Sequence, residues 1–230
     1  MKKRRSPGVA KGAPAPVPFS RAAAAAALSE LAIQHTLQEE GGYVNHPADP
    51  GGATNYGVSL RWLRRQGDDL GDVDGDGDVD GDDIRALTRN KAAAFYREKF
   101  WLEPFNQMVR LMPVATAKVF DLAVNTGPRQ AGRFAQRAVN GFLELEGDIE
   151  LQVDGRIGPK TLECWRRVAE MPRADDLLTG SLCRHAENFY RRLVEKNRAF
   201  APFLNGWLSR ASRRAEMPLM SDPLAADEQV

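Results

Sequence analysis

The sequence has little of three things that would each point to a class of protein: cysteine, net charge and long apolar runs. The two cysteines, Cys164 and Cys183, are too few for a disulfide framework, and both fall in helical patterns, where we expect buried small apolar residues. A formal net charge of +1 gives no global electrostatic case for nucleic acid. No stretch approaches the roughly 18 apolar residues of a membrane-spanning helix. These absences leave a globular protein of ordinary composition.

The N-terminal stretch is basic and rich in Pro and Ala, and we expect residues 1–20 to form a disordered arm. Pro, Gly and Lys interrupt its apolar segments, so it lacks the continuous apolar core of a conventional signal peptide. We therefore expect synthesis in the cytoplasm without such a peptide. A target outside the cytoplasm would have to be reached by release or by another export route.

Strand signals are also scarce, because the β-branched residues are scattered and rarely alternate with polar ones. Helical patterns dominate and predict an all-α fold, with Ser20 as the N-cap of the first helix. The segment TGPRQAG at 126–132 marks a boundary, with Pro128 suited to the first turn of a new helix. The expected helices cover 21 to about 40, 59–66, 83–100, 113–126, a segment from 128, 159–171 and 179–199.

A long polar segment, LQEEGGYVNHPADPGGATNYGVSL at 37–60, separates the first two expected helices. Connections between helices are usually about 2–8 residues long. Long ordered loops are where binding and catalytic groups tend to lie. One of the two glutamates at its start is therefore a candidate for the working group of an enzyme.

The choice between Glu39 and Glu40 rests on their place at the end of a helix. Gly41 and Gly42 are first of all a helix stop, and both glutamates could be solvated residues of the last turn. Carboxylates there face the negative end of the helix macrodipole, which favours the protonated acid. General acid catalysis of glycosidic cleavage needs a protonated carboxyl group. We favour Glu40 because it leads directly into the glycine turn.

The segment EGGYVNHPADPGGATNYGVSL resembles the signature of the glycoside hydrolase family 108 muramidases, which have a lysozyme-like helical fold. The resemblance continues through AAAFYREKFW (92–101) and VFDLAVNTGPRQAGRFAQRAVN (119–140). VDGRIGPKTL (153–162) and FYRRLVEKNRAFAPFLNGWLSR (189–210) then resemble the peptidoglycan-binding domain usually fused to that family. The resemblance implies cleavage of the β-1,4 bond between N-acetylmuramic acid and N-acetylglucosamine, with Glu40 as the catalytic glutamate.

The predicted organisation is therefore a lysozyme-like catalytic domain at 21–127, a helical peptidoglycan-binding domain at 128–217 and a flexible tail at 218–230. We expect a monomer that binds peptidoglycan glycan strands and uses no organic cofactor. In the second domain, the segment VDGRIGPKT has two equally good explanations. Its residues could form an ordinary turn before a helix, or they could contact the glycan directly. We expect the C-terminal aromatic residues to belong to the core, namely Phe189, Tyr190, Phe200, Phe203 and Trp207.

Several polar and aromatic residues are candidates to line a glycan groove, although Pro, Asp, Gly and Asn also form ordinary turns. Gly51 and Gly52 would allow the backbone to approach the sugar closely. The candidates for substrate contact are Tyr43, Thr54, Asn55, Tyr56, Asp121 and Asn125.

The identity of a second carboxylate stays open. A pair of catalytic acids lies about 5–5.5 Å apart in retaining glycosidases and about 6.5–9.5 Å apart in inverting ones. Asp49 is our preferred partner because it shares the loop with Glu40. Asp121 is the alternative, and it could equally be a structural residue.

A second motif, DVDGDGDVDGDD at 72–83, has the spacing of the twelve-residue calcium loop of an EF-hand, with Asp instead of Glu at position 12. Gly77 stands at the sharp turn, and Val79 can anchor the loop to the core. So many carboxylates repel one another unless a cation is present. We predict one structural calcium ion, bound by Asp72, Asp74, Asp76, Asp78, Asp80 and Asp83.

Two functions follow from these patterns. The leading one is a muramidase with a calcium-braced insertion, of the kind found as phage-type endolysins or as bacterial export helpers. The alternative is a non-catalytic peptidoglycan-binding or secretion-assisting protein on the same fold.

Overall fold

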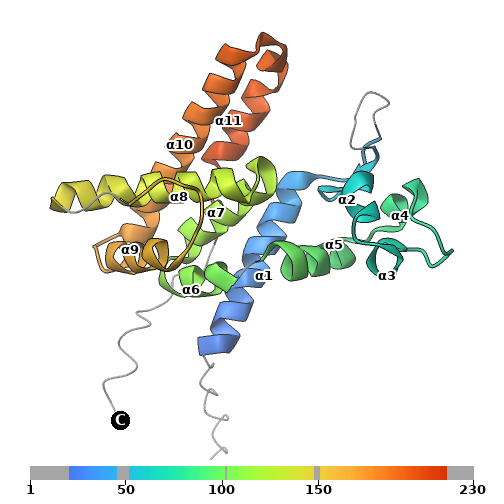
Figure 1. The fold of residues 1–230 in the computed structure, drawn as a ribbon, viewed down its shortest axis with the longest axis horizontal. Helices are drawn as coiled ribbons and strands as arrows, with labels where there is room; N and C mark the ends of the chain where they lie inside the picture. The colour runs from blue at the N-terminus through green and yellow to red at the C-terminus, as the bar shows by residue number, and fades with distance from the viewer. Residues whose placement is uncertain (1–20, 46–51, 102, 148–150, 217–230) are drawn as a thin grey trace, which may run out of the picture.

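The computed structural model describes residues 21–45, 52–101, 103–147 and 151–216. The described chain is helical apart from one short antiparallel hairpin, as the sequence predicts (Figure 1). The expected arm at 1–20, its cap Ser20 and the tail at 218–230 lie outside these residues. Among the described residues, no helix has both the length and the apolar character needed to cross a membrane.

The N-terminal half begins with one long helix and continues as short elements. Helix α1 (Arg21–Glu40) leads to strands β1 (Thr54–Asn55) and β2 (Val58–Ser59), in which Thr54 pairs with Ser59 and Asn55 with Val58. The elements that follow are α2 (Leu60–Arg64), α3 (Asp68–Gly71), α4 (Gly81–Ala86), α5 (Arg89–Phe95), a π-helix η1 (Tyr96–Phe100) and α6 (Glu103–Leu111).

The C-terminal half is made of longer helices. Helices α10 and α11 run side by side and project from the rest of the chain (Figure 1). The elements are α7 (Pro113–Thr126), α8 (Pro128–Leu143), η2 (Glu144–Glu146), α9 (Pro159–Ala169), α10 (Ala174–Lys196), η3 (Arg198–Phe203) and α11 (Leu204–Ser212).

Helix α7 lies at the centre and packs against both halves. It contacts α1 and α6 on one side and α8 and α10 on the other, so one apolar core runs through the two predicted domains. Asp175 of α10 caps α7, because its carboxylate accepts hydrogen bonds from the backbone N–H groups of Val114 (3.0 Å) and Ala115 (2.7 Å). Burial raises the pKa of this carboxyl group. The C-terminal half therefore fixes the start of the helix that both halves share.

Two predicted helices differ from those observed. The single helix expected at 83–100 is interrupted at Leu87, whose backbone is extended, and Thr88 then caps α5 by accepting a hydrogen bond from the N–H of Lys91. The last long helix starts at Ala174 rather than near 179, with Asp175 and Asp176 in its first turn, where acidic side chains favour a helix start.

Candidate functional site

Glu40 is the last residue of α1, where the sequence places it. Gly41 follows in the left-handed region (φ 74°), the conformation that lets glycine end a helix. The Glu40 side chain is 16% exposed, so it is largely withdrawn from solvent. The adjacent Glu39 side chain is 9% exposed, so the end of α1 presents two largely shielded carboxylates to the elements packed around it.

A cation from the far end of the chain meets this carboxylate. Arg210, in the last turn of α11, donates from Nη2 to Glu40 Oε1 at 2.6 Å. The same guanidinium donates from Nη2 (2.8 Å) and Nε (3.1 Å) to Asp121 Oδ1. Arg210 therefore bridges a carboxylate at the end of α1 and one in the middle of α7.

A second buried cation completes the group. Lys118 donates from Nζ to Asp121 Oδ2 (3.2 Å) and to the backbone carbonyl of Arg210 (2.8 Å), and the side chains of Lys118 and Asp121 are fully buried. The charges alternate from Lys118 through Asp121 and Arg210 to Glu40. We call these four residues the charge cluster. Two cations and two anions balance, which is what allows charged groups to be buried.

The cluster changes the electrostatic expectation for Glu40. The sequence suggested a carboxyl group facing the negative end of a helix. The structure places a cation, Arg210, against this group as well. Burial opposes the charge on Arg210, yet the two carboxylates outweigh it and raise its pKa, so it stays a permanent cation.

The hairpin backbone also reaches Glu40. A Cβ atom added to Gly57 would lie 2.7 Å from Glu40 Oε2 and 2.3 Å from the Tyr96 hydroxyl, and Gly57 has a φ of 75°. Tyr96 donates from that hydroxyl to the carbonyl of Tyr56 at 3.1 Å. Burial raises the pKa of Tyr96, so the hydroxyl remains a proton-bearing donor. The approach of the backbone to a sugar predicted for Gly51 and Gly52 stays a prediction: Gly52 has ordinary contacts with Leu60, and Gly51 lies outside the described residues.

The predicted groove residues are in different surroundings. Tyr43 is exposed, with the Arg85 guanidinium 5.5 Å from its ring centroid. Asn55 is buried and donates to the carbonyls of Ile84 (3.0 Å) and Leu87 (3.2 Å), so its amide holds the hairpin to α4. Thr54 and Tyr56 are half-buried on the same hairpin, and Asp49 lies outside the described residues.

Asp121 and Asn125 both have partners within the fold. The Asp121 oxygens accept from Lys118 and Arg210, which fits the structural alternative better than direct contact with substrate. Asn125, exposed near the end of α7, accepts a hydrogen bond from the Tyr190 hydroxyl. Burial raises the pKa of Tyr190 to about 12.

Sequence reasoning missed four residues of this site: Gly57, Tyr96, Lys118 and Arg210. Arg210 lies 170 positions from Glu40, and ASRR directly after it offers two further arginines, so no local spacing selects it. Gly57 carried a signal, since TNYG precedes a short strand and a glycine there indicates a turn.

In comparison with known proteins, each half of the chain matches a family model of its own. Residues 33–127 match the family model described as glycosyl hydrolase 108, and residues 130–212 match a predicted peptidoglycan domain. The structure of SagA from Brucella abortus is similar, with 31% sequence identity and a TM-score of 0.55 over 82% of this chain and 91% of that one. The chain belongs to the glycosyl hydrolase 108 family. A search of curated proteins finds no match.

This membership confirms the resemblance read from the sequence, including the order of the two domains. It supports a glycoside hydrolase with a role in peptidoglycan hydrolysis or binding. The Glu40 segment lies in the glycosyl hydrolase 108 match, whereas Arg210 lies in the peptidoglycan domain. The charge cluster therefore contains residues from both family matches.

The aspartate loop of this family 108 chain has the turn geometry of its motif. Asp72 accepts from the N–H groups of Gly75 (2.6 Å) and Gly77 (3.0 Å), and Gly77 has a φ of 97°. Asp80 accepts from the N–H of Asp82 at 2.7 Å and so caps α4. Val79 packs against the core, as expected for an anchor.

The predicted calcium ligands fall into two groups. Carboxylate oxygens of Asp72, Asp74 and Asp76 lie within 4.8 Å of one another, and so do those of Asp78, Asp80 and Asp83. The neighbouring carboxylate of Asp76 raises the pKa of Asp78, which reflects the repulsion within the loop. Asp83, which is buried, accepts from the N–H groups of Val73 and Asp80, both at 2.6 Å. Oxygen-only donors of this kind suit Ca²⁺.

In the peptidoglycan domain, hydrogen bonds from a side chain of α8 hold the turn at 153–158. The amide of Gln136 donates to Asp154 Oδ1 (2.8 Å) and to the carbonyl of Arg156 (3.0 Å). A Cβ atom on Gly155 would lie 2.3 Å from the carbonyl oxygen of Arg129. Packing within the fold therefore explains this turn.

The expectation of a core position is wrong for two of the C-terminal aromatic residues. Phe200 and Phe203 are 37% and 57% exposed. Phe203 stacks on Trp207 with ring centroids 5.8 Å apart, and Trp207 stacks on the buried Tyr190 at 5.3 Å. The short η3 helix turns the first two rings outward, a placement that helical spacing in the sequence does not reveal.

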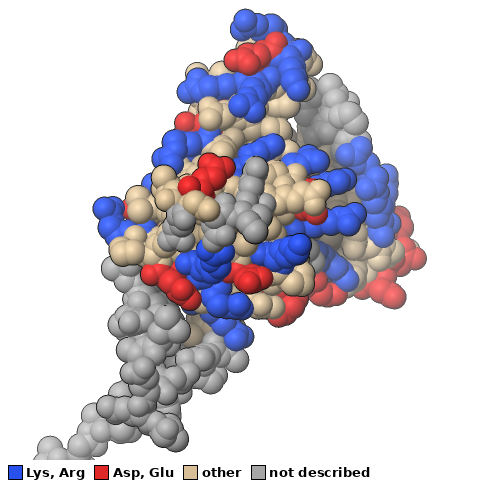
Figure 2. Space-filling view, turned by 60° about the vertical axis from the view of Figure 1, so that its left-hand side comes forward, with Lys and Arg blue, Asp and Glu red and all other residues tan. Residues whose placement is uncertain are grey.

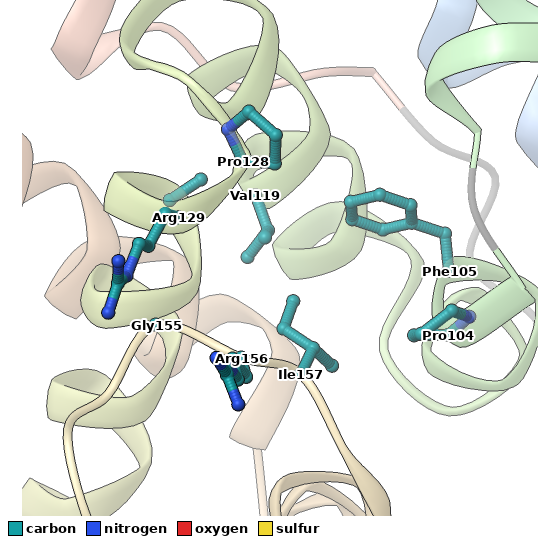
Figure 3. Close-up of a pocket in the computed structure, with 9 residues that line it drawn as sticks. Pro104, Phe105, Val119, Pro128, Arg129, Gly155, Arg156 and Ile157 are labelled. Atoms are coloured by element: carbon teal, nitrogen blue, oxygen red, sulfur yellow. The ribbon is translucent and has the colours of Figure 1, made fainter.

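A pocket of about 440 Å³ lies between α6, α7 and the 153–158 turn (Figure 3). Phe105, Val119 and Ile157 supply apolar walls, and Arg129 and Arg156 also line it. Val119 and Asp121 are two residues apart on α7, so they point to opposite sides of that helix. The pocket is therefore separate from the Glu40 site.

Proposed function

We propose that this chain hydrolyses the β-1,4 bond between N-acetylmuramic acid and N-acetylglucosamine in peptidoglycan, with Glu40 as the general acid. The observation that carries the proposal is the setting of Glu40 at the end of α1. There the carboxylate is largely shielded from solvent and oriented by Arg210, and the hairpin backbone at Gly57 closely approaches it. A shielded, oriented carboxyl group is what protonation of a glycosidic oxygen requires.

In the proposed step, protonated Glu40 gives its proton to the glycosidic oxygen as the bond from that oxygen to the anomeric carbon breaks. The leaving sugar departs with a free hydroxyl group. The oxygen of water becomes bonded to the anomeric carbon, and a proton from this water restores Glu40 over the full cycle.

Asp49 remains our proposed second carboxylate. Asp121 is a weaker candidate, because it is fully buried and both of its oxygens are bonded to cations. Near-normal turnover of an Asp49→Asn variant would contradict the role given to Asp49.

The test compares wild type, Glu40→Gln and Glu39→Gln on purified peptidoglycan by following new reducing ends. Glu39 is a matched control, because it is the adjacent carboxylate and its ion-pair partner is Arg213, beyond the end of α11. We expect Glu40→Gln to lose activity by a factor of about 10³ or more and Glu39→Gln to stay within about threefold of wild type. Equal activity of Glu40→Gln and wild type would rule out Glu40 as the general acid.

The alternative, a non-catalytic wall-binding protein, has its own support. Phe200 and Phe203 are exposed rings, which suit stacking against sugars. Figure 2, with the side that carries α8 and α9 turned forward, shows Lys and Arg spread over the surface with fewer acidic side chains among them. A basic face attracts an anionic wall polymer. Sedimentation of both wild type and Glu40→Gln with the wall, without reducing ends from either, would favour this alternative.

We further propose that the loop at 72–83 binds one structural Ca²⁺. Its support is the ligand spacing and the two carboxylate groups, and its role would be to hold α3 and α4 together. We also propose that the protein acts as a monomer on the cell wall, after export or release.

A further inference from the structure

Two ion pairs join the end of α11 to the end of α1. Arg210 pairs with Glu40, and Arg213, just beyond α11, pairs with Glu39 at 2.7 Å. Both carboxylate side chains are shielded, with Glu40 16% and Glu39 9% exposed, so the two pairs differ at their arginines: the Arg210 side chain is 13% exposed and that of Arg213 is 55% exposed. Water and salt screen the exposed guanidinium of Arg213 more than the shielded one of Arg210.

Arg210 is itself held in place by two residues of α7. Asp121 accepts hydrogen bonds from two of its N–H groups, and Lys118 donates to its backbone carbonyl, which lies in the last turn of α11, where a cation is favourable. A planar guanidinium can hold two carboxylates in fixed directions, which a lysine ammonium cannot do. The position of Glu40 Oε1 is thus set by a chain of contacts that begins in the core.

We propose that Arg210 is a positioning residue for Glu40: it orients the carboxyl group and sets the pH range in which that group holds a proton. The proposal rests on the proposed function of Glu40. It makes the peptidoglycan domain a part of the catalytic centre, because that domain supplies the arginine that pairs with Glu40.

The titratable and charged groups around Glu40 and its cluster come from five elements. Replacing Arg210 removes one of the two cations of the cluster and leaves the pair of Lys118 with Asp121. Tyr96 on η1, Tyr190 on α10 and Arg210 on α11 interact electrostatically with Glu40. His35 on α1 interacts with Glu39 on the same helix, with Lys118 and Asp121 on α7 and with Arg210.

The experiment measures the pH dependence of reducing-end release from purified peptidoglycan by the full chain. It compares wild type, Arg210→Gln and the matched control Arg213→Gln. Loss of the Arg210 cation lets Glu40 keep its proton at higher pH, so we expect the pH optimum of Arg210→Gln to rise by about one unit. We expect kcat at the optimum to fall about tenfold, because the carboxyl group is no longer oriented. Arg213→Gln should have the wild-type profile.

The outcomes separate the two proposals. No reducing ends from wild type at any pH would overturn the proposed function itself. An active wild type with an Arg210→Gln profile of unchanged shape, whether at full or uniformly reduced activity, would overturn the positioning role. An equal shift in Arg213→Gln would do the same, since it would assign the effect to general surface charge.

Arg210→Lys covers the case in which Arg210→Gln fails to fold, which thermal unfolding would reveal. Lysine keeps the charge and loses the fixed fork of donors. We expect an unchanged pH optimum with a kcat about tenfold lower and little change in KM. Full wild-type kcat in Arg210→Lys would overturn the orienting role.

Discussion

At the scale of single residues, the site depends on one position having no side chain. Gly57 faces Glu40 Oε2 and the Tyr96 hydroxyl at distances that leave no room for a Cβ atom. Its φ of 75° also disfavours any other residue. Gly67 has nearly the same φ, 77°, with nothing within 4 Å of an added Cβ atom.

This pair of glycines gives a controlled prediction. Gly57→Ala and Gly67→Ala should each lose about 1 kcal/mol from the unfavourable φ. Gly57→Ala must in addition displace Glu40 or Tyr96, so we expect its reducing-end activity to fall at least about tenfold, while Gly67→Ala stays near wild type. Urea unfolding and the reducing-end assay measure the two effects. Equal activities would show that the contact at Gly57 has no bearing on Glu40.

The residues of the site differ in how far the sequence could predict them. Glu40 could be predicted because a helix stop and a family motif coincide at that position. Asn55 and Asp121 were identified as noteworthy, but their buried hydrogen bonds to Leu87 and Lys118 depend on which elements pack together. The contacts of Arg210 with Glu40 and Asp121 depend on how α11 is placed by its packing against α10, which the local sequence does not reveal.

At the scale of elements, the aspartate loop is tied to the site through the hairpin. The loop ends in α4, and the amide of Asn55 on β1 binds the carbonyls of Ile84 and Leu87 at the end of that helix. The turn of the same hairpin carries Gly57 against Glu40. Ordering of the loop should therefore also order the hairpin.

Calcium should stabilise the protein through this loop. We expect the thermal unfolding midpoint to rise by several degrees between chelator and millimolar Ca²⁺, because the ion binds the folded loop. Asp76→Asn removes a predicted ligand and should abolish most of the rise. Asp82, in the same loop, pairs with Arg85 and is not a predicted ligand, so Asp82→Asn should show the same rise as wild type. The same midpoint with and without Ca²⁺ in wild type would contradict the calcium proposal.

The elements themselves were largely predictable, and the errors have local causes. The first helix and the helices at Pro113 and Pro128 begin or end at Gly and Pro signals, which act over a few residues. The break at Leu87 within the predicted 83–100 helix was hidden, because Leu is a good helix former and the N-cap role of Thr88 competes with helix continuation.

At the scale of the whole molecule, the two family domains share one core and one charge cluster around α7. The domain order could be predicted from motifs. The shared cluster could not, since buried charges give no periodic signal and are tolerated only where partners from distant segments meet.

The half-buried His35 makes global stability depend on pH. Burial lowers the pKa of His35; Asp121 and Glu39 oppose this effect, while Lys118 and Arg210 add to it. Below a pH of about 6.5 the unfolded chain binds a proton that the folded chain resists, so this contribution to stability is present above that pH and is lost as the pH falls.

We therefore expect the free energy of unfolding, measured in urea, to fall between pH 7.5 and 5.5, and to fall less in His35→Gln. His185, whose pKa is also lowered by burial, remains in both proteins and cancels in the comparison. The same loss of stability in both would mean that His35 is protonated without cost in the folded protein.

The most direct test of the central claim identifies the sugar at each new reducing end. Peptidoglycan digested by wild type is reduced with borohydride, and the fragments are analysed by mass spectrometry beside a Glu40→Gln digest. The account predicts reduced N-acetylmuramic acid at the new ends with wild type and none with Glu40→Gln. Reduced N-acetylglucosamine at those ends, or the same products from both proteins, would contradict it.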